Sequence, residues 1–339
     1  MRRLLRSCLI DLPSLIFGLL VYVITHKTPS CSYQSMIRMF CVTRGRSNDW
    51  LSRLVGWIKG SYEIDTPRGV LGNLSESIRG EIITKLRNQG YYIFPQRLPS
   101  SVCDRLFQYA ITQPCKIRKM DDENLGEFKL ITYHREKPLA VRYDFNTQDI
   151  INNIDVQKLM ADLSLLSVAQ EYLASKPVID VTSMWWHTAY SDKPDREAAQ
   201  YFHFDMDRPK WLKFFIYLTD VSSVNGPHMF VAGSQKTGAI PSDLLRKGYA
   251  RLTDIEVLQY FDKNDLKEFI APRGTIIAED TRGLHKGKHV DCADRLILQI
   301  QFSNILFGAT YSKAHFKGDL VSDLQLRIKQ FPGLYRAYL

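Results

Sequence analysis

VIDVTSMWWHTAY (178–190) opens a series of short apolar runs that decides the fold class of this 339-residue chain. β-Branched and aromatic residues are frequent in the runs, and turn-forming residues separate them. Regular strand spacing of this kind is typical of an antiparallel sandwich or barrel. The further runs are AQYFHFD (199–205), WLKFFIYLTDV (211–221), PHMFVAG (227–233), EFIAPRGTIIAED (268–280) and RLILQIQFSNILF (295–307).

The chain before residue 178 has a mixed pattern. Apolar residues at helical spacing predict helices at about 75–88, 100–111 and 159–174, and shorter runs predict strands at 91–94 and 139–144. We therefore expect a mainly β protein with flanking helices (α+β), built on a double-stranded β-helix of the jelly-roll or cupin-like type. Its core is expected at about 178–308, within a domain of residues 63–339.

Residues 1–62 form a separate N-terminal region that is helical and partly apolar in pattern. One predicted helix has an apolar face and leaves Arg53 and Lys59 on the other side. The members of that face are Trp50, Leu51, Leu54, Val55 and Ile58.

The positive charge of the chain belongs to this region. Residues 1–60 hold nine Lys and Arg against two Asp, a net +7, which leaves +2 for the rest of the +9 chain. Nucleic-acid binding predicts a basic stripe on the folded domain, so the distribution argues against a nucleic-acid partner. An anionic membrane surface, an acidic partner or a solvated arm without a partner each fit it.

The most apolar run, 15–24 (LIFGLLVYVI), is short for a membrane span, which needs about 20 residues. A shallow membrane anchor, an uncleaved signal anchor and a helix packed on the domain all remain open. Six scattered cysteines without a CxxC pair indicate reduced thiols and a cytoplasmic protein. Peripheral contact with the cytoplasmic face of a membrane, through residues 1–62, is compatible with this.

A candidate metal site lies in the second run. His203 and Asp205 alternate with Phe204, so both side chains share one face of an extended chain and can act as neighbouring metal ligands. A third ligand, His285, follows the run TIIAED and completes two His and one carboxylate, which leaves coordination positions open.

A second His-x-Asp motif, at 289–291, competes with the first. Only 23 residues separate it from the next histidine, His315, which is room for one strand. The 79 residues between Asp205 and His285 hold at least three strands of ~5–6 residues each, as closure of a jelly roll needs. We therefore choose the first motif.

Four stretches in this order resemble the phytanoyl-CoA dioxygenase-like family of iron(II)/2-oxoglutarate oxygenases. They span about two-thirds of the chain and depart from the family pattern at Gln235, where a His is usual, and at Gly287, where a small hydroxyl residue is common. The stretches are 85–106 (KLRNQGYYIFPQRLPSSVCDRL), 201–221 (YFHFDMDRPKWLKFFIYLTDV), 225–238 (NGPHMFVAGSQKTG) and 274–295 (GTIIAEDTRGLHKGKHVDCADR).

The resemblance implies Fe(2+) as cofactor, 2-oxoglutarate as cosubstrate and O2 as oxidant. Arg295, ten residues after His285, opens an inward strand and suits the buried C5-carboxylate of 2-oxoglutarate, because guanidinium binds carboxylate in a bidentate manner. Pairing with the neighbouring Asp294 at the surface is the alternative. Asp205 favours hydroxylation, because related halogenases lack this carboxylate.

Further residues are candidates for the same site. Lys213 and Tyr217 share a strand face and are predicted to contact the cosubstrate. His187, Arg142 and Asp144 are predicted to contact the substrate, with core packing and a solvated surface pair as the respective alternatives.

The expected function is hydroxylation of an unactivated C–H bond in a small-molecule, lipid or sugar substrate, with release of succinate and CO2. A jelly-roll binding protein without activity and a cupin-like metal enzyme that does not use 2-oxoglutarate are the alternatives.

Overall fold

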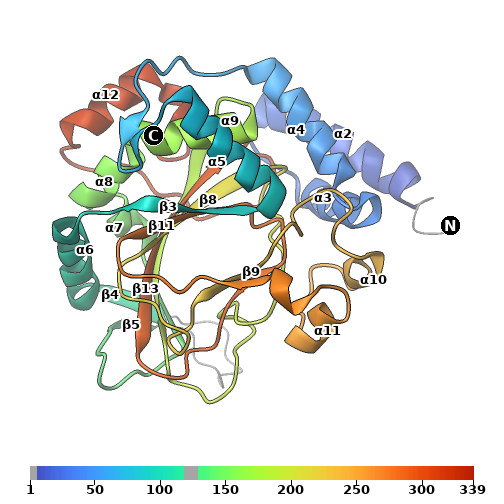
Figure 1. Ribbon diagram of the computed structural model, residues 1–339. Coiled ribbons are helices and arrows are strands. Elements are labelled where there is room, and N and C mark those ends of the chain that lie inside the picture. The colour runs from blue at the N-terminus through green and yellow to red at the C-terminus, as the bar shows by residue number, and fades with distance from the viewer. Residues whose placement is uncertain (1–5, 118–128) are drawn as a thin grey trace.

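A computed structural model describes residues 6–117 and 129–339, and within them eight strands form one antiparallel sheet (Figure 1). Its two central pairings join the longest strands, with Arg295 opposite His187 and Ile297 opposite Tyr217. In order across the sheet the strands are β3 (Tyr91–Arg97), β11 (Thr275–Glu279), β8 (Trp211–Tyr217), β13 (Asp294–Ser303), β7 (Val178–Thr188), β6 (Arg142–Phe145), β4 (Pro114–Ile117) and β5 (Lys129–Thr132).

A smaller antiparallel sheet faces the large one. It has the order β10 (Leu266–Glu268), β9 (His228–Val231) and β12 (His285–Gly287). Phe230 of β9 and the nearby Phe269 pack with Trp185, Phe215 and Ile297, which project from the large sheet. Two antiparallel sheets closed around a shared interior confirm the predicted double-stranded β-helix.

The sheets differ from the prediction in two places. Strands β3 to β6 precede residue 178 and nevertheless extend the large sheet, so pairing reaches beyond the predicted 178–308 core. The run 199–205 is not a regular strand, because only Phe202 and His203 form isolated bridges, to Leu252 and His285.

Helices cover the outer face of the large sheet. Outward residues such as Leu212, Phe214 and Leu298 share one apolar cluster with Ile83 and Leu165 of these helices. Ser75 caps the first of them by accepting a hydrogen bond from the Ile78 amide, as its sequence predicts. The helices are α5 (Glu76–Gln89), α6 (Ser100–Thr112), α8 (Ile154–Met160), α9 (Leu163–Leu173) and α12 (Ser322–Gln330).

Shorter helical elements occupy the connections. They are η1 (Ser7–Asp11), α7 (Thr147–Ile150), α10 (Ser242–Leu245), α11 (Asp254–Leu258), η2 (Lys263–Asp265) and η3 (Pro332–Leu334). The short strands β1 (Arg68–Gly69) and β2 (Gly72–Asn73) pair with each other in the segment after residue 60.

The N-terminal helices α2 (Leu12–Thr25), α3 (Ser30–Thr43) and α4 (Arg46–Lys59) lie together on the side where the chain begins (Figure 1). They are packed on the barrel, because Leu15 and Phe40 share a cluster with Phe204, and the Phe40 and Phe204 ring centroids are 5.4 Å apart. No helix of the described ranges is long and apolar enough to cross a membrane.

The predicted apolar face of α4 is wrong in part. Leu51 and Val55 are buried, but Trp50 is 73% exposed and Ile58 68% exposed. The side of α4 that faces the barrel includes polar residues that the prediction did not place there. Asp49, for example, accepts a hydrogen bond from Arg282 at 2.8 Å. Spacing alone identifies an apolar stripe but does not say which side a neighbour covers.

Candidate metal centre and cavity

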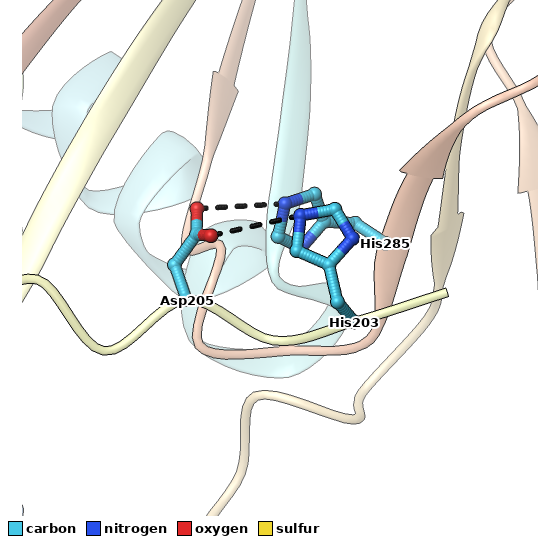
Figure 2. A group of neighbouring side chains, drawn as sticks. All are labelled: His203, Asp205 and His285. Atoms are coloured by element: carbon cyan, nitrogen blue, oxygen red, sulfur yellow. Dashed lines mark ion pairs between the residues drawn. The ribbon is translucent and has the colours of Figure 1, made fainter. Parts of the chain in front are cut away.

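His203, Asp205 and His285 converge in the interior between the two sheets (Figure 2). His203 Nε2 lies 3.6 Å from Asp205 Oδ1, and His285 Nε2 lies 3.5 Å from Asp205 Oδ2. Reciprocal backbone hydrogen bonds of 2.9 and 2.8 Å between His203 and His285 fix the two histidines opposite each other. The three ligand atoms lie within 4.8 Å of one another, as metal ligands do.

Both imidazoles are oriented for metal binding. His203 Nδ1 donates to the Tyr201 carbonyl oxygen at 2.9 Å, and His285 Nδ1 donates to that of Gly283 at 3.0 Å. Because a carbonyl oxygen only accepts, the proton sits on Nδ1 and the Nε2 lone pair faces the centre. Burial lowers the pKa of both imidazoles, so they are neutral at neutral pH, as metal ligands must be.

Asp205 is held as a carboxylate. Burial by itself would raise its pKa, but the Lys213 ammonium, 2.6 Å from Oδ2, and the two imidazoles lower it well below the usual range. Lys213 also lies 3.5 Å from Asp207 Oδ2. Lys213 was predicted to contact the cosubstrate; in the protein its ammonium faces this cavity and is paired with the Asp205 carboxylate, a candidate metal ligand.

The metal centre opens into a cavity of about 590 Å³. Its walls come from inward residues of β7, β8 and β13, which alternate with the outward residues under the helices. Many of the lining groups are charged or polar, including Arg142, Asp144, Ser183, Asp207, Arg251, Gln299, Arg295 and Tyr311.

Arg295 lines this cavity and is 1% exposed. It donates to the Gly226 carbonyl oxygen and, over 2.7 Å, to His187 Nδ1, and its buried Nε has no hydrogen-bond partner in the part of the chain that the structure describes. No Asp or Glu of the described ranges lies within ion-pair distance of it, so the alternative pairing with Asp294 is not observed; Asp294 instead binds Arg135 at 2.7 Å. Burial lowers the pKa of Arg295 to about 10, which leaves it a cation at neutral pH.

The remaining predicted site residues are His187, Arg142, Asp144 and Tyr217, and not all of them lie where the prediction placed them. His187 lines the cavity and positions Arg295. Arg142 and Asp144 form an ion pair of 2.7 Å at the cavity wall, half-buried rather than on an open surface. The Tyr217 hydroxyl donates to the Phe269 carbonyl oxygen at 3.0 Å and accepts from the His228 amide at 3.2 Å, so it is engaged with the backbone.

Sequence reasoning missed a buried pair next to the metal centre. His228 Nε2 lies 3.0 Å from Glu279 Oε1, and the His228 ring stacks on His285 with centroids 5.6 Å apart. Burial raises the pKa of Glu279 to about 8 and lowers that of His228 to about 3. Glu279 comes 51 residues after His228, and no local pattern links them. Asp207, by contrast, continues the alternation of His203 and Asp205 and was open to prediction.

The competing motif does not form a metal site. His289 and Asp291 are 3.9 Å apart at their closest polar atoms, and His315 is exposed elsewhere. Among the described residues, the groups able to hold a metal are the predicted one and a second one, His228, Glu279 and His285, which shares His285 with it.

The comparisons with known proteins show similarity of fold only. No protein-family model and no curated protein matches the chain. Similar solved structures include AviO1 from Streptomyces viridochromogenes Tue57, with 16% identity, a TM-score of 0.44 and coverage of 68% of this chain and 96% of that one. The non-heme alpha ketoglutarate dependent epimerase SnoN from nogalamycin biosynthesis has 13% identity, a TM-score of 0.46 and coverage of 67% and 84%.

EctD from S. alaskensis, solved with bound Fe, has 14% identity, a TM-score of 0.46 and coverage of 72% and 79%. Matches at this level carry no weight for the function. The fold and the buried His203–Asp205–His285 group of the chain itself agree with its sequence resemblance to the iron(II)/2-oxoglutarate oxygenases.

Proposed function

We propose that the chain is an iron(II)- and 2-oxoglutarate-dependent oxygenase that hydroxylates a C–H bond of a small-molecule, lipid or sugar substrate. The observation that carries the proposal is the presence, in one cavity, of a buried two-His, one-carboxylate group and of Arg295, a buried arginine with no acidic partner among residues 6–117 and 129–339.

The three ligands fit a divalent transition metal such as Fe(2+). Two neutral imidazole nitrogens and one carboxylate oxygen on one side of the ion leave the other side open to exogenous ligands. Lys213 supports this arrangement, because it engages one carboxylate oxygen of Asp205 and restricts the rotation of the ligand.

Arg295 fits the distal carboxylate of 2-oxoglutarate. A desolvated guanidinium without a counter-charge is costly, and a carboxylate ligand relieves that cost through charge-assisted hydrogen bonds. Gly287 leaves room beside it, since an added Cβ would lie 3.1 Å from Arg295 Nη2. His187, which accepts from Nη2, holds the guanidinium in place.

When bound, iron and 2-oxoglutarate supply an oxidation in which one O2 atom enters succinate, the other enters the substrate as hydroxyl, and CO2 leaves. The chain's own residues then hold the metal and the cosubstrate, and they orient and select the substrate. Asp207, Arg251 and Tyr311 line the cavity together with the Arg142–Asp144 pair, so we propose a substrate with several polar or charged groups.

A cupin-like enzyme without 2-oxoglutarate would need the same metal ligands but no buried cation in the wall of the cavity. Arg295 therefore favours the oxygenase.

The proposal is tested by turnover. The purified chain, supplied with Fe(2+), 2-oxoglutarate and O2, is screened against fractionated metabolite extracts, and succinate is measured. We expect succinate that requires both iron and O2 and rises with one or more fractions. His285→Ala is the inactive control, and His289→Ala, in the competing motif, is the matched active control. Absence of any 2-oxoglutarate consumption by the iron-loaded protein would refute the assignment.

A further inference from the structure

The outer face of α2 is apolar along its whole length. Its inward residues Leu15 and Tyr22 pack on the barrel, while the opposite side is exposed, with Phe17 at 59% and Leu20 at 61%. We call the exposed set of this helix and the turn before it the α2 face; it consists of Leu9, Ile10, Leu12, Ile16, Phe17, Leu20, Val23 and Ile24. Monomeric soluble proteins seldom expose so many neighbouring large apolar side chains, and exposed patches of this kind commonly mark binding sites for a protein or a membrane.

Helix α4 lies on the same side of the molecule as α2 (Figure 1), and it exposes apolar residues of its own. Trp50 and Trp57 are seven residues apart and therefore share a helix face, with Leu54 between them, and Trp57 is 84% exposed. Tryptophan is the residue most typical of the boundary between lipid and water, because its ring is apolar and its N–H needs a polar partner.

The charges around these helices indicate which kind of surface the two apolar faces would bind. Both acidic residues between positions 6 and 60 turn inward: Asp11 is buried against Arg38 at 2.7 Å, and Asp49 binds Arg282 at 2.8 Å. The exposed charges are consequently basic, namely Arg6, Lys27, Arg44, Arg46 and Arg53. In the sequence, Arg6 precedes the residues of the α2 face and Lys27 follows them. An apolar face rimmed by cations complements an anionic bilayer, whose headgroups carry negative charge above an apolar interior.

The length of α2 determines how it would lie. Its 14 residues extend ~21 Å at 1.5 Å per residue, short of the ~30 Å hydrocarbon core of a bilayer. The inward side of the helix is also occupied by the barrel, so the helix is free to enter lipid from one side only.

We propose that the α2 face, together with Trp50 and Trp57 of α4, is an interfacial membrane-binding surface that docks the protein flat on an anionic bilayer. The helix lies in the plane of the interface with its apolar residues below the headgroups and its terminal cations among them. Phe40 of α3, the helix that packs against both α2 and α4, contacts Phe204, which lies between the candidate ligands His203 and Asp205.

Vesicle binding tests the proposal independently of catalysis. The full chain is mixed with phosphatidylcholine vesicles that contain either no phosphatidylserine or about 30%, and sedimentation gives the partition coefficient. We expect binding to the anionic vesicles that weakens at high salt, because the ionic part of the attraction is screened. The test variant is Phe17→Asp/Leu20→Asp, for which we expect a partition coefficient at least about tenfold lower.

Matched controls separate docking from folding. Ile255→Asp/Leu326→Asp places the same two charges on exposed apolar positions of α11 and α12, and we expect wild-type binding. The altered side chains of both variants are exposed, so wild-type melting temperatures are expected. Tryptophan emission adds a direct probe: Trp185, Trp186 and Trp211 are buried, so a blue shift on vesicle addition reports Trp50 and Trp57.

Three outcomes overturn the proposal. The first is equal binding by wild type and Phe17→Asp/Leu20→Asp. The second is vesicle binding without any change in tryptophan emission, which refutes the part played by α4. The third is a dimer in light scattering that the same variant converts to a monomer while wild type ignores vesicles, because the face would then bind a second copy of this chain.

Discussion

Replacement of Arg295 by Ala separates cosubstrate binding from metal binding. Arg295 lies in the same cavity as the metal ligands but contacts none of them; its partners are the Gly226 carbonyl oxygen and His187. We therefore expect the variant to bind iron with wild-type affinity. The carboxylate of 2-oxoglutarate would enter the cavity without a counter-charge, and its affinity should fall.

The size of the loss follows from the burial of the site. Removal of one partner from a buried ion pair costs roughly 3–5 kcal/mol. At about 1.4 kcal/mol per tenfold change, this corresponds to a rise of about two to three and a half orders of magnitude in the apparent KM for 2-oxoglutarate. Arg295→Lys keeps the charge but loses the planar fork, so we expect it to lie between wild type and Arg295→Ala.

Thermal unfolding gives a second readout that does not depend on turnover. A ligand that binds only the folded state raises the melting temperature. With a redox-inert divalent metal, 2-oxoglutarate should stabilise wild type and not Arg295→Ala. An unchanged KM together with an unchanged stabilisation would refute the role assigned to Arg295.

Other changes test the surrounding structure. Arg208→Ala should lower the free energy of unfolding by about 3–5 kcal/mol in urea titration, because Arg208 binds buried Asp180 at 2.6 Å and the carboxylate would be left unpaired; a loss below about 1 kcal/mol would contradict this. Glu279→Gln tests the buried carboxyl group. The pKa of Glu279 is raised to about 8 in the folded protein, so its contribution to the free energy of unfolding is fully present below about pH 4.5. Wild type should therefore lose stability as the pH rises from 4.5 to 8, by up to ~1.4 kcal/mol per pH unit. Equal pH slopes of the free energy of unfolding in metal-free wild type and Glu279→Gln would refute this prediction. Deletion of residues 1–62 should give insoluble protein, since Phe202 and Phe204 lose their cover; a soluble, folded product on gel filtration would show an independent domain.

The interior of the sheet was predictable because strand alternation is a local property. The pattern around β13 places Arg295 inward and Leu296 outward, as observed. The spacing between Asp205 and His285 favoured His203, Asp205 and His285 over the motif at 289–291, and these three residues do converge in the structure. The expected sheet core began at residue 178 because the earlier strands, such as β4, have only a few residues and little alternation of their own.

Long-range pairing explains what the sequence did not reveal. His228 and Glu279 meet only after β9 and β11 are placed on opposite sheets, and the exposed side of α4 depends on how Asp49 docks on Arg282. Lys213 was predicted to share a strand face with Tyr217 and to contact the cosubstrate, but its pairing with Asp205 depends on how residues 206–210 lead from Asp205 into β8. A sequence pattern therefore shows which side of a strand or helix is buried, whereas the residues that this side contacts depend on tertiary packing.

Anaerobic equilibrium binding of Fe(2+) and 2-oxoglutarate tests the central claim most directly, because it needs no knowledge of the substrate. The wild-type chain should bind one Fe(2+) and, only then, one 2-oxoglutarate, seen as the visible absorption of the chelate. His285→Ala should bind neither, and His289→Ala should bind both. Tight iron binding by His285→Ala, or an iron-loaded wild type that takes up no 2-oxoglutarate, would contradict the account.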